Sequence, residues 1–123
     1  MLLGAAYALS GCGASQHDEV QAKVQQFARA TAAGDYLSLC QQVLAPSLIQ
    51  RLAGANLTCQ QAMRVFVHSV SNPTLSVAKV TVAGQRASAV VLATATGQQA
   101  SLTTIELVNT KNGWRLASLA SPR

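Results

Sequence analysis

The sequence feature that most restricts the fold of this chain is a change of hydrophobic periodicity at Pro73. Before Pro73, apolar residues recur at the three- and four-residue intervals of helices. After it, apolar and β-branched segments alternate with tight-turn signals. Strands joined by tight turns must pair antiparallel. The chain is therefore predicted to be α+β, with N-terminal helices packed on one face of a four-stranded antiparallel sheet.

The helical half carries clear signals for where its helices begin and end. Ser15 is placed to cap a long first helix, and Gly34 is suited to end it in a left-handed conformation. Its apolar face holds Val20, Val24 and Phe27, and Thr31 continues that face with a methyl group that can be buried. Three shorter helices are expected to start at Asp35, at Pro46, and at the capping box formed by Thr58 and Gln61.

The last of these helices should turn one face toward the core and another toward water. The residues expected on its inner face are Ala62, Val65, Phe66, Ser69 and Val70. His68 falls on the other face with Arg64, so we expect a solvated histidine.

The strand-forming half divides at three turn signals. Gly84, Gly97 and Gly113 each lie in a short polar or glycine-containing stretch of the kind that closes a hairpin. The strands between them are predicted at residues 75–82, 87–96, 101–108 and 114–119.

The N-terminus has the pattern of an export signal. An uncharged apolar run over residues 2–9 is too short to span a bilayer and ends in Leu9-Ser10-Gly11-Cys12, which resembles the bacterial lipobox. Residues 1–11 are predicted to be a signal peptide, Cys12 the lipidated cysteine, 12–16 a tether and 17–121 a single domain. The protein is then extracytoplasmic and anchored to the bacterial cell membrane. No Lys or Arg precedes the run. Either the start of the sequence is placed too far downstream, or the segment is not a signal but an apolar helix packed on the domain.

The two remaining cysteines are expected to pair. Export places the chain in an oxidising compartment, where Cys40 and Cys59 can form a disulfide. Two alternatives stay open: a metal site shared with His17 and His68, and a pair of buried free thiols.

Charge and composition restrict the classes of function. The net charge is +5, but the nine basic residues are spread singly with no two adjacent, so a nucleic-acid partner is not expected. A mildly basic surface facing anionic lipid headgroups or wall polymers is the simpler account. There are only four acidic residues, which leaves few groups for metal binding or general-base catalysis. No cofactor or metal is predicted.

Two short motifs and the order of elements resemble a known family. Ala-Ala-Gly-Asp-Tyr at residues 32–36 and Asn-Gly-Trp-Arg-Leu at 112–116 are similar to segments of the nuclear transport factor 2-like domains, which have a cystatin-like fold. The likeness covers roughly residues 16–120 and is greatest to the domains of small actinobacterial-type lipoproteins. It implies a sheet curled around the helices to leave a cone-shaped pocket.

No catalytic motif of the enzymes that share this fold can be matched residue by residue to this sequence. Candidate pocket residues are Tyr36, Phe66, His68 and Glu106. We expect a non-catalytic binding or interaction domain that holds an apolar ligand or an envelope protein. The alternative is a small ketosteroid-isomerase-like or hydrolase-type enzyme using His68 or Glu106 in the pocket.

The position of Glu106 depends on which way its strand faces. By alternation it lies opposite Ile105 and Leu107. If these two residues face the core, Glu106 points to solvent, and with the reverse orientation it enters the pocket.

Overall fold

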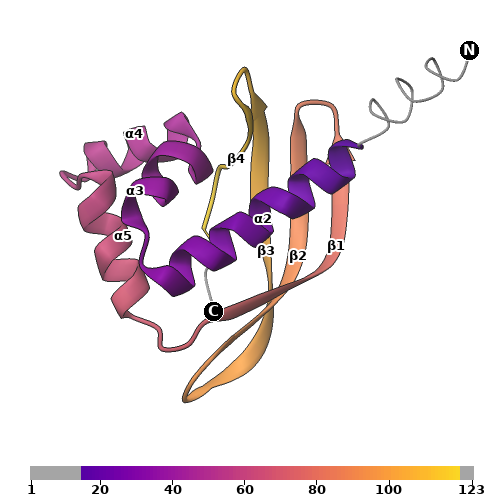
Figure 1. Cartoon of the computed structure of the whole chain (residues 1–123). Coiled ribbons are helices and arrows are strands. Elements are labelled where there is room, and N and C mark those ends of the chain that lie inside the picture. Colours follow the sequence, from indigo (N-terminus) through magenta and orange to yellow (C-terminus); the bar gives the residue numbers. More distant parts are fainter. Residues whose placement is uncertain (1–14, 120–123) are drawn as a thin grey trace, which may run out of the picture.

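A computed structural model describes residues 15–119 of the chain (Figure 1). The predicted signal peptide, Cys12, residues 13 and 14 of the predicted tether and the last two residues of the predicted domain lie outside this range. None of the helices in the described range has the length and apolar character needed to cross a membrane.

The long first helix has the limits that its sequence predicts. Helix α2 spans Gln16–Ala33, so it begins within the predicted tether. The Ser15 hydroxyl accepts a hydrogen bond from the Asp18 amide at 3.1 Å. Gly34 ends the helix at a φ of 68°, a left-handed conformation that glycine adopts without steric cost. Residues at helical spacing along one face are buried: Val20, Val24, Phe27, Ala30 and Thr31.

Four short elements follow α2. They are α3 (Tyr36–Ser38), the π-helix η1 (Leu39–Val43), α4 (Pro46–Gly54) and α5 (Cys59–His68). The predicted starts at Asp35, Pro46 and Thr58 are confirmed, and the Thr58–Gln61 capping box is complete. The π-helix was not predicted.

The predicted inner face of α5 is partly wrong. Val65 is 69% exposed, Ser69 is also exposed, and Met63 is buried in their place. The disulfide explains the difference, because Cys59 must face η1. Residues three, four and seven positions after Cys59 share its side of the helix. The inward-facing residues of α5 are therefore Cys59, Ala62, Met63 and Phe66.

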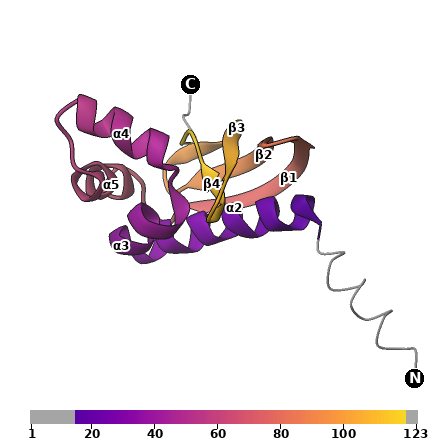
Figure 2. The ribbon, with the colours of Figure 1, turned by 90° about the horizontal axis from the view of Figure 1, so that it is seen from above.

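The second half forms one antiparallel sheet with strand order β1-β2-β3-β4, as predicted. The strands are β1 (Thr74–Ala83), β2 (Arg86–Ala95), β3 (Gln98–Thr110) and β4 (Gly113–Leu116). Helix α2 lies across one face of this sheet, which curves over it in Figure 2. The α+β class and the helix-then-meander order are confirmed.

The core lies between α2 and the inner face of the sheet. Val24 and Phe27 of α2 are buried in the same cluster as sheet residues with exposures of 0–2%: Ala89, Val91, Ile105, Leu107, Trp114 and Leu116. The cluster is mostly aliphatic, as the small number of aromatic residues in the sequence requires.

A bulge in β1 allows that strand to present apolar residues inward along its whole length. Val77 pairs with Val91, but the next pair is Lys79 with Val90, so Ala78 is the extra residue. The inward positions change from odd to even numbers at that point. They are Leu75 and Val77 before the bulge, and Val80 and Val82 after it.

The two edges of the sheet differ. The β4 edge is covered, because Leu44 forms a parallel bridge with Leu116 and the Ala45 amide donates to the Leu116 carbonyl at 2.7 Å. The β1 edge pairs with no further strand among residues 15–119.

Candidate ligand cavity

A cavity of about 320 Å³ lies at one end of the sheet, where the β2–β3 hairpin extends past the helices at the lower end of Figure 1. Its walls come from three places: the C-terminal half of α2, the end of α5 with the segment that follows it, and the strand ends near the hairpin. These walls include Phe27, Ala28, Thr31, Phe66, Val70, Pro73, Leu75, Ala93 and Ala95.

One wall of the cavity is aromatic. Phe27 of α2 and Phe66 of α5 have ring centroids 6.0 Å apart and are tilted by 33°. Pairs at this separation attract one another beyond the area that they bury. The two helices thus supply one aromatic wall, and Phe66 is correctly placed only while α5 keeps its position beside α2.

Thr31 is the buried polar residue of this cavity. It is 5% exposed, and its Oγ1 has no hydrogen-bond partner within residues 15–119. Trp114 Nε1 and Arg115 Nε are also buried without partners there, but neither residue lines the cavity. An unpaired buried hydroxyl costs free energy. Thr31 Oγ1 has less than 1 Å² of accessible surface, so this oxygen is covered by the protein and does not face the cavity.

The cavity mouth is polar and uncharged. Gln98 and Gln99, at the start of β3, are exposed and line the opening. Ser101 and Thr103 follow them on the inward-facing positions of β3. No Asp, Glu, His, Lys or Arg of the described chain lines this cavity.

Of the four candidate pocket residues, only Phe66 lines the cavity. Tyr36 and His68 lie together elsewhere, with the tyrosine hydroxyl 3.2 Å from His68 Nε2, where α3 contacts α5. The Arg64 guanidinium carbon stands 5.5 Å from the centre of the Tyr36 ring. The side chain of His68 is exposed, as its helical face predicts. It is on the outer side of α5, whereas Phe66 is on the inner side.

Glu106 does not enter the cavity either. Ile105 and Leu107 are 0% and 1% exposed, so they face the core, and Glu106 points to solvent from the opposite face of β3. Of the two orientations that the alternation along β3 allows, the structure has the one in which Glu106 is exposed to solvent.

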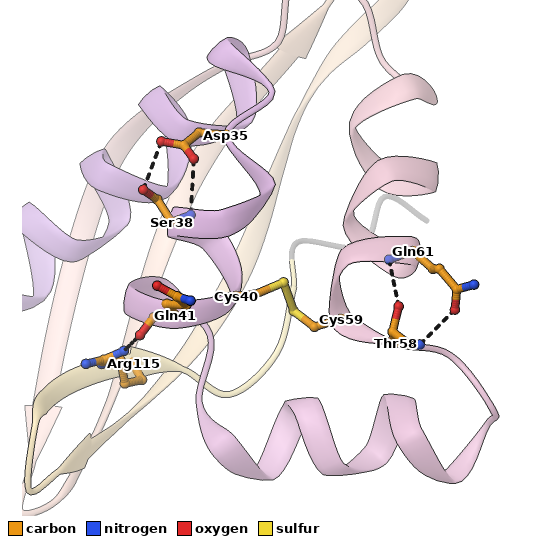
Figure 3. Close-up of a disulfide and its surroundings, with 8 residues drawn as sticks. All are labelled: Asp35, Ser38, Cys40, Gln41, Thr58, Cys59, Gln61 and Arg115. Atoms are coloured by element: carbon orange, nitrogen blue, oxygen red, sulfur yellow. Dashed lines mark hydrogen bonds between the residues drawn. A yellow bond between two sulfur atoms is a disulfide. The ribbon is translucent and has the colours of Figure 1, made fainter.

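The Cys40–Cys59 disulfide is present and fixes the position of α5 (Figure 3). It joins η1 to the first turn of α5, with a Cα–Cα distance of 5.9 Å. The alternatives of a metal site and of free thiols at these two cysteines are therefore wrong. Residues 15–119 contain no group of three His, Cys, Asp or Glu side chains that could hold a metal ion.

A second, more open hollow lies on the other side of η1, beside Arg115. Arg115 donates to the Gln41 carbonyl at 2.8 Å (Figure 3), and Lys23 Nζ donates to the Gln42 carbonyl at 3.0 Å. Burial, and secondarily the nearby Arg115 charge, lower the pKa of Lys23 below its ordinary value. These two cations bind carbonyl groups of η1, so we interpret them as supports of the π-helix.

No family model, curated protein or solved structure matches this chain.

Proposed function

We propose that this protein is a lipid-anchored, extracytoplasmic, non-catalytic binding domain that holds a small apolar ligand in the cavity between α2, α5 and the β2–β3 hairpin. The observation that carries the proposal is a cavity of about 320 Å³ whose walls are mostly apolar and carry no ionisable residue of the described chain. Small-molecule sites are mostly apolar with a few polar groups, and about 300 Å³ is the lower end of their usual volume.

The proposal includes the family. A chain with one long helix, short helices and a four-stranded meander has the order of elements expected of a nuclear transport factor 2-like domain. A cavity between the long helix and the sheet is compatible with the cone-shaped pocket of that family. The Gly34-Asp35 step between α2 and α3 and Trp114 on β4 support the same assignment.

The chemistry of the cavity favours binding over catalysis. General acid–base catalysis needs a titratable group within hydrogen-bond reach of the substrate. The polar residues of these walls are Thr, Ser and Gln, which do not exchange protons near neutral pH. The alternative enzyme would use His68 or Glu106, and both are exposed outside the cavity.

Occupation of the cavity can be tested with a probe and a cavity-filling variant. The full chain carrying Cys12→Ser would be titrated with 2-methylnaphthalene by calorimetry. Ala28→Phe places a ring in the cavity and should abolish binding. Ala22→Phe makes the same change on an exposed position of α2 and should not. Equal binding by both variants, or no binding by the parent chain, would contradict the proposal.

A natural ligand can be sought in the same protein. Native mass spectrometry of the chain purified from its own host would report a bound small molecule as an added mass. We expect this mass to be lost in Ala28→Phe and kept in Ala22→Phe.

A further inference from the structure

Strand β3 is much longer than β4, the strand that covers the edge of β3 facing away from β2. β3 has 13 residues and β4 has four, and β4 pairs only with Leu107–Thr110 of β3. Next to that stretch, the Glu106 amide donates to Ser118 Oγ at 3.1 Å, and the Ala117 amide donates to the Glu106 carbonyl at 2.7 Å. Between Glu106 and the β2–β3 hairpin, no strand of residues 15–119 pairs with this edge of β3 (Figure 1).

The backbone groups of Leu102 and Thr104 point toward this uncovered edge. In an antiparallel ladder, the amide and carbonyl of successive residues point alternately to the two sides of the strand. Those of Glu106 are bonded on the side away from β2, and the register of β3 with β2 is regular over this stretch. Thr104 and Leu102 lie two and four residues before Glu106, so their amides and carbonyls point the same way. Neither residue has a hydrogen-bond partner on that side among residues 15–119.

The uncovered edge lacks the features that usually prevent a further strand from adding to a sheet. Such edges are commonly blocked by charged side chains, prolines or bulges. No charged residue and no proline occurs from Ala87 to Ile105, and residues 101–105 of β3 pair with β2 without a bulge. Leu102 is also 67% exposed, and it lies directly across from Leu92, which is 39% exposed, on the face of the sheet away from α2. An added strand would cover part of this apolar pair.

We propose that the uncovered edge of β3, at residues 101–105, binds an extended and uncharged segment of a partner protein, which adds a strand to the sheet. A row of alternating amides and carbonyls is matched best by another extended backbone, and strand addition is a recurring mode of peptide recognition. The partner residue beside Leu102 would be apolar, because neighbouring side chains on one face of a sheet pack together. A charged residue there would lose water without gaining a partner. This inference does not depend on the ligand proposed for the cavity.

Hydrogen exchange of the free protein tests whether the edge is uncovered. The amides of Leu102 and Thr104 should exchange at least about ten-fold faster than those of Thr103 and Ile105, which bond to β2. NMR on the full chain carrying Cys12→Ser, at a low and a high protein concentration, would measure these rates. Protection of Leu102 and Thr104 at both concentrations would mean that another segment of this chain covers the edge. Protection only at the high concentration would mean that a second copy does, and either result would contradict the proposal.

A neutral peptide of seven alternating Thr and Val residues, with blocked ends, is the probe for strand addition. It should shift the NMR signals of Leu102 and Thr104 and slow the exchange of their amides. The same peptide N-methylated at its three central residues lacks hydrogen-bond donors there, so it should bind at least about ten-fold more weakly. Equal binding of the two peptides would show that backbone pairing does not hold the segment.

Two variants of the full chain locate the contact. Leu102→Lys places a charge beside the added strand and should weaken peptide binding at least about ten-fold. Thr81→Lys makes a similar change on an exposed outward position of β1 and should leave binding within about two-fold. The reverse result, or no saturable binding by the parent chain, would contradict the proposal. Ala28→Phe, which fills the cavity, should bind the peptide as the parent chain does, so a failure of the ligand proposal would not affect this result.

Discussion

Thr31 is a residue whose burial can be predicted from the sequence and whose unpaired hydroxyl cannot. Its place on an apolar helix face predicts a buried methyl group, and the residue is indeed buried. The unpaired hydroxyl could not be predicted, because a buried hydroxyl finds a partner only if another element packed against it offers one. Residues 66 and 93, which line the same cavity as Thr31, are far away in the sequence.

The unpaired hydroxyl has a consequence for stability. We expect Thr31→Val to raise the free energy of unfolding by about 1 kcal/mol, since it removes a buried polar group without a partner and preserves the side-chain shape. The two residues have similar helix propensities, so the helix itself should not contribute. Urea unfolding of the ligand-free chain would measure the change.

Thr31→Ser is the matched control for this measurement. It keeps the hydroxyl and loses a buried methyl group, so stability should fall by about 1 kcal/mol. A loss of stability in Thr31→Val would instead mean that the hydroxyl already has a partner in the free protein.

At the scale of elements, the residues at which helices begin and end could be predicted well, because each boundary depends on a few neighbouring residues. The Ser15 cap, the Gly34 stop and the Thr58–Gln61 capping box are local signals, and all three are confirmed. The rotation of α5 is not local. It is set by the bridge from Cys59 to Cys40, so Val65 faces solvent although its spacing predicts the inner face.

The sequence carries a signal for the bulge in β1. Leu75 and Val77 alternate in one phase, and Val80 and Val82 in the other. A strand without a bulge would turn one of these pairs outward, so the change of phase predicts an inserted residue at Ala78 or Lys79. The cavity itself needed the structure, because α2, α5 and the strand ends meet only in three dimensions.

The disulfide should stabilise both the fold and the cavity. The two cysteines are 19 residues apart, and closing such a loop contributes about 3 kcal/mol on the chain-entropy account. We expect Cys40→Ala with Cys59→Ala to lose about that much in urea unfolding. Probe binding should also weaken, since Phe66 would no longer be held beside Phe27.

Cys12→Ala is the control, because it leaves the bridge intact. A double variant as stable as its parent would show that the disulfide contributes little. Two alkylated thiols in the exported parent protein would contradict the bridge itself.

At the scale of the whole molecule, the proposed lipid anchor determines where the cavity operates. Helix α2 begins at Gln16, four residues after Cys12, which is the first residue of the predicted mature chain. A lipid on Cys12 would therefore keep the domain close to the membrane surface. The position of the anchor follows from sequence alone, because Cys12 lies outside the described residues.

The anchor can be tested in the native host. We expect the parent protein in the membrane fraction, with an N-terminal peptide whose mass shows an acylated Cys12. Cys12→Ala should lose the acyl mass, since alanine has no thiol to modify. A parent protein that retains an unmodified Met1 or an unacylated Cys12 would contradict the lipoprotein assignment.

The edge of β1, which no other strand of residues 15–119 covers, matters most when copies of the protein are crowded. Anchored copies would diffuse in two dimensions and collide often, and an unpaired strand edge is a template for edge-to-edge polymerisation. The bulge at Ala78 interrupts the regular row of backbone groups on that edge, and the exposed Lys79 beside it adds a like charge to every copy. The bulge therefore has two effects. It keeps the inward positions of β1 apolar before and after Ala78, and it disfavours edge-to-edge assembly into fibres.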